Sequence, residues 1–324
     1  MDKFGVLAVG NAIVDMIAQV DEQFLTDHNM TKGAMMLVDQ ETSDKIFSSL
    51  NNSTKTPGGS AGNTMACFGS FGGNGAYIGK TGDDDLGQEF RDGMNEQNIH
   101  FTTPAITNGT PTARCMITVT PDAERTMNTY LGAAGFVTPS DIDEDLIKQS
   151  SVTYLEGYLF DQEESKQAFI KASELTKKHG KMLSLTLSDT FCVERFRDEF
   201  KSFIKEHVDI LFANEAELLS LYETDDFDAA IKTLQADVKI GAVTRGEKGS
   251  VIVSSENMVA VPAIAPAQLV DTTGAGDSYA AGFLYGFTEG KDLAECGRLG
   301  SLAASEVISH IGPRPEKSLS AMAA

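Results

Sequence analysis

The chain has 324 residues, of which 26 are Lys or Arg and 47 are Asp or Glu, so its formal net charge is −21. Such a charge opposes binding to nucleic acid and to anionic membrane surfaces, and we expect neither as a partner. No apolar stretch reaches the roughly 20 residues that span a bilayer. The N-terminal apolar run lacks the basic segment of an export signal.

The cysteines give no sign of a metal site or a disulfide framework. They lie far apart in the sequence, without the spacing that zinc ligands require. They are Cys67, Cys115, Cys192 and Cys296. Reduced thiols are typical of the cytoplasm, and we therefore expect a cytoplasmic protein.

The first third of the chain contains short strand patterns joined by turns and long connections. These are AIVDMIAQV, GAMMLVD and TARCMITVT. We expect such pieces, drawn from about residues 12–40 and 100–130, to form a small sheet that covers a ligand cleft. The chain has no internal repeat, no low-complexity tract and no linker rich in Pro or Ser. We therefore predict one domain over residues 1–324 that carries a lid.

The segment MITVT within this region has the periodicity of a half-buried strand. Ile117 and Val119 alternate with Met116, Thr118 and Thr120. Strict alternation predicts a strand with one face covered and the other face open.

From Val152 onward, strand and helix patterns alternate. The segments that predict strands are VTYLEGYLF, MLSLTL, VDILFAN, KIGAVTRG, GSVIVSS and MVAVPA. The segments that predict helices are DQEESKQAFIKASELTKKHG, VERFRDEFKSFIKE and EAELLSLY, followed by two closing helices at about 274–288 and 292–309. Repeated βαβ units predict an α/β fold with a mainly parallel sheet and helices on both of its faces.

Two glycine-rich segments suggest phosphate binding, but neither matches a common nucleotide motif. A Walker A loop ending at Gly79-Lys80-Thr81 would need glycine where the chain has Asn74. A dinucleotide fingerprint would need a small residue where Ile78 or Tyr279 stands. These departures argue against P-loop NTPases and NAD enzymes.

Six motifs in order along the chain resemble those of the ribokinase-like family of carbohydrate and nucleoside kinases, also called the PfkB family. They are VGNAIVD, GGSAGNT, ANEAE, TRGEKGS, DTTGAGDSYAAGF and SHIGPRP. The resemblance implies a ribokinase-like fold, in which a small β-sheet lid stands on the central mainly parallel sheet. It also implies an ATP-dependent phosphotransferase that uses Mg²⁺, with K⁺ as a candidate cation, and a monomer or homodimer acting on a small molecule.

The stretch DTTGAGD places Asp277 just behind Gly274, Ala275 and Gly276, at the predicted start of a helix. Backbone amides at a helix N-terminus have no intrahelical partner, so they form an anion hole. There Asp277 can accept a proton from a substrate hydroxyl while the amides stabilise the transferred phosphoryl group, as the resemblance also implies. The alternative is that Asp277 only complements the helix dipole.

The resemblance assigns the nucleotide and metal residues. Asp271 helps to hold a monovalent cation, or else is a turn residue at a strand end. Asn214 and Glu217 organise Mg²⁺ through water near the ATP phosphates, although the pair also fits an N-cap with its N3 partner. By resemblance, Thr244 and Gly246 contact the ATP phosphates, although this segment alone also fits a tight turn.

The substrate residues come from two early motifs. Asn11 and Asp15 lie four positions apart, and a carboxylate paired with a carboxamide suits recognition of vicinal hydroxyls. Gly58 and Gly59 permit close backbone approach, and Asn63 adds a polar group. In the family these positions bind the sugar, although each also fits turn chemistry.

Further details resemble the adenosine kinase branch. Ser60 follows the glycine pair where ribokinases carry lysine, and Met65 could line an apolar pocket for a base. Tyr158 is a candidate for stacking on the base, or a core aromatic residue. Arg125 lies in the lid and could swing over the phosphates, whereas we expect Lys80 to be solvated.

We therefore expect a kinase that phosphorylates the 5′-hydroxyl of a nucleoside, most simply adenosine to AMP. One alternative is a PfkB sugar kinase for ribose, fructose or 2-keto-3-deoxygluconate. An alternative of another class is a nucleoside-binding sensor without catalysis, which an intact Asp277 argues against, because binding alone needs no base.

Overall fold

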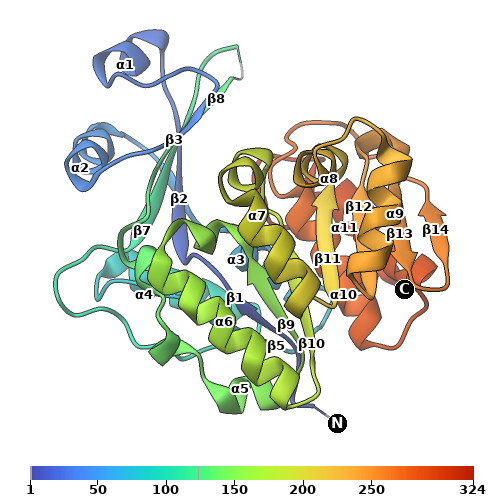
Figure 1. Ribbon diagram of the computed structural model, residues 1–324. Helices are drawn as coiled ribbons and strands as arrows, with labels where there is room; N and C mark the ends of the chain where they lie inside the picture. The colour runs from blue at the N-terminus through green and yellow to red at the C-terminus, as the bar shows by residue number, and fades with distance from the viewer. Residues whose placement is uncertain (1, 123) are drawn as a thin grey trace.

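The computed structural model describes residues 2–122 and 124–324 (Figure 1). Its larger sheet has nine strands in the order β14-β13-β12-β11-β10-β9-β1-β5-β6. These strands are β1 (Phe4–Val9), β5 (Gly75–Ile78), β6 (Ile99–Phe101), β9 (Ser150–Glu156), β10 (Met182–Thr186), β11 (Ile210–Asn214), β12 (Ile240–Thr244), β13 (Ser250–Ser254) and β14 (Met258–Val261). The pairings from β6 through β12 are parallel, and only β13 and β14 join antiparallel. The prediction of a mainly parallel sheet is confirmed.

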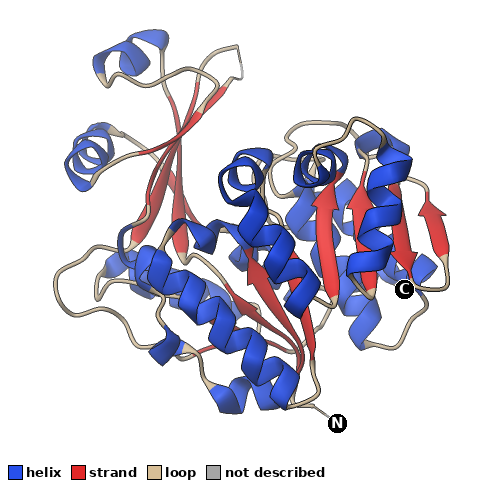
Figure 2. Cartoon of the chain, in the orientation of Figure 1, coloured by secondary structure: helices blue, strands red, loops and turns tan. Residues whose placement is uncertain are grey.

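Helices cover both faces of this sheet and form a separate apolar core with each face (Figure 2). One face packs against α5 (Glu144–Lys148), α6 (Glu163–Lys178), α7 (Thr190–His207), α8 (Glu215–Tyr222) and α9 (Phe227–Asp237). The other packs against α3 (Ser60–Ser70), α4 (Asp85–Glu96), α10 (Ala275–Thr288), α11 (Leu293–Val307) and α12 (Leu319–Ala323). Burial on both faces explains why the strands are continuous runs of apolar residues. Among the described residues, no helix is long and apolar enough to cross a bilayer.

A second sheet of five strands forms the lid, in the order β3-β8-β7-β2-β4. Its strands are β2 (Ile13–Gln19), β3 (Met35–Leu37), β4 (Thr54–Pro57), β7 (Ala113–Val119) and β8 (Arg125–Tyr130). Four of them come from the two segments expected to form the lid, whereas β4 lies outside both. Two helices, α1 (Glu22–Asp27) and α2 (Gln40–Ser49), lie beside this sheet on the side away from the larger sheet (Figure 1).

Two details of the expected strands are wrong. The alternation in MITVT predicted one open face of β7, but Ile117 on one face is 3% exposed, and Met116 and Thr118 on the other face are fully buried. Helices α1 and α2 pack against the face that carries Met116. The strand expected from Val152 through Phe160 ends at Glu156, and a 3₁₀ turn over Gly157–Asp161 follows. A Cβ atom on Gly157 would lie 2.6 Å from the Thr186 carbonyl oxygen, so glycine allows the chain to turn there against the neighbouring strand.

The topology brings the sequence motifs to one edge of the larger sheet. Strands β1, β9, β10, β11 and β12 run parallel, so their carboxyl ends meet at that edge. The lid begins there, because β2 follows β1 after a short connection. Open α/β sheets bind ligands at such an edge. The short 3₁₀ turns are η1 (Gly132–Phe136), η2 (Pro139–Asp141), η3 (Gly157–Asp161) and η4 (Gly246–Lys248).

Candidate active site

Two helices that begin with glycine meet at the centre of the site. Gly59 starts α3 with φ +77° and Gly274 starts α10 with φ +78°, and neither helix has a side-chain cap. Positive φ favours glycine at both positions. The two helices pack against each other. Their N-termini therefore present backbone amides on both sides of Asp277, which lies in the first turn of α10.

The carboxylate of Asp277 accepts hydrogen bonds from α3 on both of its oxygens. Ser60 Oγ donates to Oδ1 at 2.6 Å, and Asn63 Nδ2 donates to Oδ2 at 3.3 Å. Burial raises the pKa of Asp277 from its usual 3.8 to about 6, while the two hydrogen bonds act in the opposite direction. The carboxylate is thus mainly ionised at neutral pH but more basic than an exposed aspartate, as general-base chemistry requires.

The amides ahead of Asp277 differ in their surroundings. A Cβ atom on Gly276 would meet nothing within 4 Å, so the backbone there is open to a ligand. A Cβ atom on Gly274 would lie 2.7 Å from Pro313, so only glycine fits. The amide of Ala275 donates to the Thr272 carbonyl at 3.2 Å, which closes the turn. The loop thus has the open backbone that an anion hole needs, most clearly at Gly276.

Asp15 lies within lid strand β2, and its side chain packs against the glycine pair. It is 8% exposed, and a Cβ atom on Gly58 would lie 2.3 Å from its Oδ2. A Cβ atom on Gly59 would lie 2.2 Å from the Asn11 carbonyl oxygen, so the close approach expected of the glycines is present. Burial raises the pKa of Asp15 to about 7, whereas the charges of Arg314 and Arg125 lower it.

The carboxamide of Asn11, which we expect to recognise vicinal hydroxyls together with Asp15, makes a hydrogen bond to Glu156. Asn11 Nδ2 donates to Glu156 Oε1 at 2.8 Å, and the amide of Ala61 donates to Oε2 at 2.8 Å. Glu156 is 1% exposed, and burial raises its pKa to about 7. Sequence reasoning missed this residue. Its position at the carboxyl end of a buried strand, like that of Asn214, was the available signal.

Two of the residues proposed for a base pocket have other surroundings. Met65 is fully buried in the core, where its Cε lies 2.2 Å from a Cβ atom placed on Gly75, so its assignment to a substrate pocket is wrong. Tyr158 is half-buried at the carboxyl edge, and its hydroxyl donates to Asp189 Oδ2 at 3.0 Å. Asn63, by contrast, lies in the site with only 5% of its surface exposed.

The expected nucleotide residues gather at the ends of β11 and β12, where Asn214 is the register partner of Thr244. Asn214 and Glu217 form a reciprocal capping box, in which the Glu217 amide donates to Asn214 Oδ1 at 2.8 Å and the Asn214 amide donates to Glu217 Oε2 at 2.9 Å. Asn214 Nδ2 also donates to Glu217 Oε1 at 2.6 Å. Glu217 is 6% exposed, and burial raises its pKa to about 7. Gly246 has φ +57° and open space around it. Glu217 therefore caps α8. Because both of its carboxylate oxygens already accept from Asn214, a contact with Mg²⁺ would be made through water.

The lid contacts the anion-hole loop through Arg125. Its Nη2 pairs with Asp271 Oδ2 at 2.8 Å, and its Nη1 donates to Thr273 Oγ1 at 3.1 Å. Asp271 also accepts from the amides of Thr273 and Gly312. The charge of Asp271 is thus already matched by Arg125, so its carboxylate does not fit a free cation site in this arrangement.

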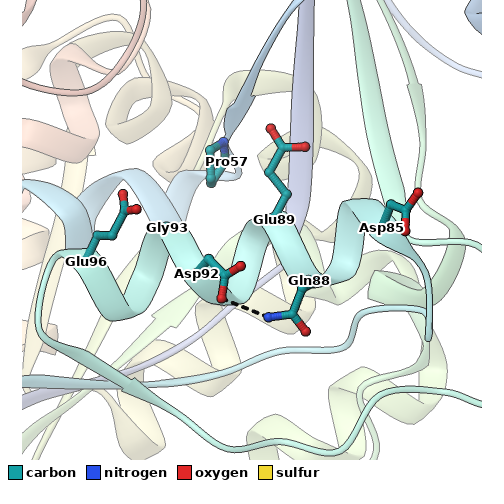
Figure 3. A pocket seen from close by; sticks show the side chains of 7 residues that line it. All are labelled: Pro57, Asp85, Gln88, Glu89, Asp92, Gly93 and Glu96. Atoms are coloured by element: carbon teal, nitrogen blue, oxygen red, sulfur yellow. Dashed lines mark hydrogen bonds between the residues drawn. The ribbon is translucent and has the colours of Figure 1, made fainter.

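Two further charged features are Lys80 and an acidic groove on α4. Lys80 is not solvated as expected, because it pairs with Asp141 and is largely buried. A shallow groove on α4 is lined mainly by acidic side chains (Figure 3). Its lining residues are Pro57, Asp85, Gln88, Glu89, Asp92, Gly93 and Glu96. None of the predicted site residues lines this groove, and its negative charge disfavours phosphates.

Several known proteins resemble this chain over nearly its whole length. The family model of the pfkB family of carbohydrate kinases matches residues 26–319. The crystal structure of adenosine kinase from Sinorhizobium meliloti is 49% identical with a TM-score of 0.92, and the match covers 99% of this chain and 98% of that one. A probable sugar kinase from Rhizobium etli CFN 42 is 48% identical with a TM-score of 0.93, over 100% and 98% of the two chains.

A curated relative extends this comparison. Adenosine kinase of Saccharomyces cerevisiae is 28% identical over 329 residues, which cover 95% of each chain. PfkB kinases use ATP as the phosphoryl donor, and the fold of this chain is ribokinase-like. The chain therefore belongs to the PfkB family of carbohydrate kinases, as a phosphotransferase of the adenosine kinase or sugar kinase type.

Proposed function

We propose that this kinase transfers the γ-phosphoryl group of ATP to the 5′-hydroxyl of a nucleoside, and that adenosine is the substrate. The nearly full-length likeness to adenosine kinases supports this, but a probable sugar kinase is almost equally similar. The choice between the two rests on the cleft side of the lid, meaning the face that carries Asp15 and Arg125, where a row of apolar side chains also lies.

Strand register defines that surface. One row across the lid runs Met35, Met127, Ile117 and Ile17, and the next row runs Leu37, Thr129, Cys115 and Asp15. Residues in register share a face of the sheet. The same face carries Arg125, which reaches the anion-hole loop, so both rows lie on the cleft side. An apolar row thus runs beside the carboxylate proposed to bind the ribose.

This arrangement matches the two halves of a nucleoside. Asp15 would accept hydrogen bonds from the ribose hydroxyls, and the apolar row would cover the base. Met35 is 40% exposed and Leu37 is 46% exposed, which leaves apolar surface for a ligand to bury. Ribose or a ketose would fill the polar half alone. This apolar row is the observation that carries the proposal.

In the proposed reaction, the Asp277 carboxylate takes the proton of the 5′-hydroxyl, and the freed oxygen attacks the γ-phosphorus. The bond from that phosphorus to the β,γ-bridging oxygen breaks, and ADP leaves. Amides of the Gly274–Gly276 turn that have no partner among the described residues, most clearly that of Gly276, stabilise the charge on the transferred group. Arg125 lies close enough to this loop to approach the phosphates from the lid.

Mg²⁺ would be held through water near Glu217 and Asn214. Within residues 2–122 and 124–324, no three His, Cys, Asp or Glu side chains cluster in a way that suits direct coordination, so a water-mediated mode fits best. When bound, the ion supplies positive charge to the phosphates. Because Arg125 already pairs with Asp271, the proposed reaction involves no monovalent cation.

Substrate competition tests the proposal directly. We expect kcat/KM for adenosine to exceed that for ribose, fructose and 2-keto-3-deoxygluconate by at least about 100-fold, since each hydrogen bond or buried ring contributes on the order of 1–3 kcal/mol. ADP formation measures all four substrates. A higher kcat/KM for any of the sugars would assign the chain to the sugar kinases, and no turnover of any substrate would favour a binding protein.

Two adjacent methionines provide a matched pair of variants for that assay. Met35 lies on the cleft side of β3 and Met36 on the opposite side, with exposed fractions of 40% and 43%. Met35→Ala should raise KM for adenosine several-fold, because it removes apolar contact with the base. Met36→Ala should leave KM unchanged. Equal effects of the two substitutions would show that the lid face does not contact the base.

Asp277→Asn should lower kcat by roughly 100-fold or more, the scale of a lost general base. The same substitution should raise thermal stability at pH 7.5. The folded-state pKa of about 6 lies above 3.8, so ionisation at neutral pH opposes folding by at most about 3 kcal/mol. Steady-state kinetics and thermal unfolding measure both effects. An Asn variant with near wild-type kcat would remove Asp277 from the base role.

Glu217→Gln should raise the Mg²⁺ concentration needed for half-maximal activity, because one negative charge near the phosphates is lost. The side-chain carbonyl oxygen of the variant can still accept a hydrogen bond from the Asn214 backbone amide at the start of α8, so the fold should hold. Activity titrated against Mg²⁺ at fixed ATP measures the shift. An unchanged Mg²⁺ response would reduce Glu217 to a helix cap.

A further inference from the structure

The loop after α11 brings an additional cation into the site. It carries the motif SHIGPRP, in which Arg314 Nε donates to Asn63 Oδ1 at 3.3 Å. Glu306, which is 3% exposed, holds both ends of this loop. It accepts from the amide of Lys317 at 3.1 Å and lies 3.2 Å from His310 Nε2. Arg314 therefore projects from an anchored segment.

The contact with Asn63 fixes the orientation of an amide that is otherwise ambiguous. A guanidinium can only donate, so it selects the carbonyl oxygen of Asn63 as its partner. The Nδ2 group is then directed toward Asp277 Oδ2, to which it donates at 3.3 Å. A short relay, Arg314 to Asn63 to Asp277, thus links the C-terminal loop to the proposed base.

The Nη end of the Arg314 guanidinium is also buried. Its Nη2 atom is buried and has no hydrogen-bond partner within the part of the chain that the structure describes. It lies 3.5 Å from a Cβ atom placed on Gly62, an ordinary van der Waals distance, so the guanidinium packs against the first turn of α3. Its positive charge acts on Asp15 from this position.

We propose that Arg314 is a positioning residue of the substrate site, which orients Asn63 toward Asp277 and supplies positive charge that keeps Asp15 ready to accept the substrate hydroxyls. The second part rests on the proposed function, in which Asp15 binds ribose. The first part holds for any acceptor alcohol, because it concerns only the base. Arg314 acts through Asn63 and Asp15.

The charges around Asp15 determine the sign of the expected pH effect. Arg314 and, on β8, Arg125 favour the ionised form, whereas burial and the charge of Asp277 on α10 oppose it. On β7, the residue in register with Asp15 is Cys115, whose thiol is buried. The pKa of Asp15 is about 7 with both arginines present. Removal of Arg314 should therefore raise that pKa and weaken substrate binding at neutral pH.

The experiment compares Arg314→Gln and Arg314→Lys with the wild type. We expect Arg314→Gln to lower kcat/KM for adenosine about 10-fold at pH 7 and to move the acid limb of the pH profile up by about one unit. Arg314→Lys should leave the acid limb of the pH profile at its wild-type position, because the positive charge is kept. Its kcat should be lower than that of the wild type, because an ammonium group does not reproduce the geometry of the guanidinium.

Arg298→Gln is the matched control, since Arg298 pairs with Glu295 on the surface of α11, and its profile should equal the wild type. If Arg314→Gln had the same pH profile of kcat/KM as the wild type, the proposal would be overturned. A loss of thermal stability with no shift of the acid limb of that profile would also overturn it. If the wild type phosphorylates a sugar and not adenosine, the proposed function fails. The profile measured with that sugar then supports the orienting role if kcat falls in Arg314→Gln and overturns it otherwise.

Discussion

The site depends on holding several carboxylates out of water at one edge of the sheet, in a chain that already carries a net charge of −21. Asp15, Glu156, Glu217 and Asp271 are each less than a tenth exposed, and Asp277 is half-buried among them. Burial of ionised groups is costly unless hydrogen bonds or opposite charges compensate. Hydrogen bonds and ion pairs in the site meet part of this requirement. The pKa values of Asp15, Glu156, Glu217 and Asp277 remain raised, because burial outweighs these interactions.

Compensation comes from parts of the chain that are far apart in sequence. Glu156 accepts from the N-terminus of α3, and Asp277 accepts from Ser60 in that same helix. Asp271 pairs with Arg125 of the lid, so the lid and the anion-hole loop share one ion pair. Incoming ATP would bring negative charge to this loop and compete for the guanidinium. If ATP binds as we propose, this competition would couple the position of the lid to nucleotide binding through one arginine.

The sequence predicted the sheet, the helices on its two faces and the motifs at its carboxyl edge, because apolar periodicity and glycine loops are local signals. The sequence-based predictions were wrong where contacts between residues far apart in the sequence determine the position of a side chain. Met65 lies in the core since α3 turns it toward β5, and Lys80 is paired by a distant Asp141. Glu156 and Arg314 were missed because each gains its role only when α3 packs beside it. Hydrogen-bond partners at such separations leave no periodic pattern.

The central claim is that Asp277 is an ionised but unusually basic carboxylate. ¹³C NMR of protein labelled at aspartate carboxyl carbons, with Asp277→Asn to assign the resonance, measures its pKa in the absence of turnover. The account predicts a pKa of about 6, raised by burial and held there by Ser60 and Asn63. A pKa near the usual 3.8 would contradict it, because such a carboxylate is no more basic than one in open solvent.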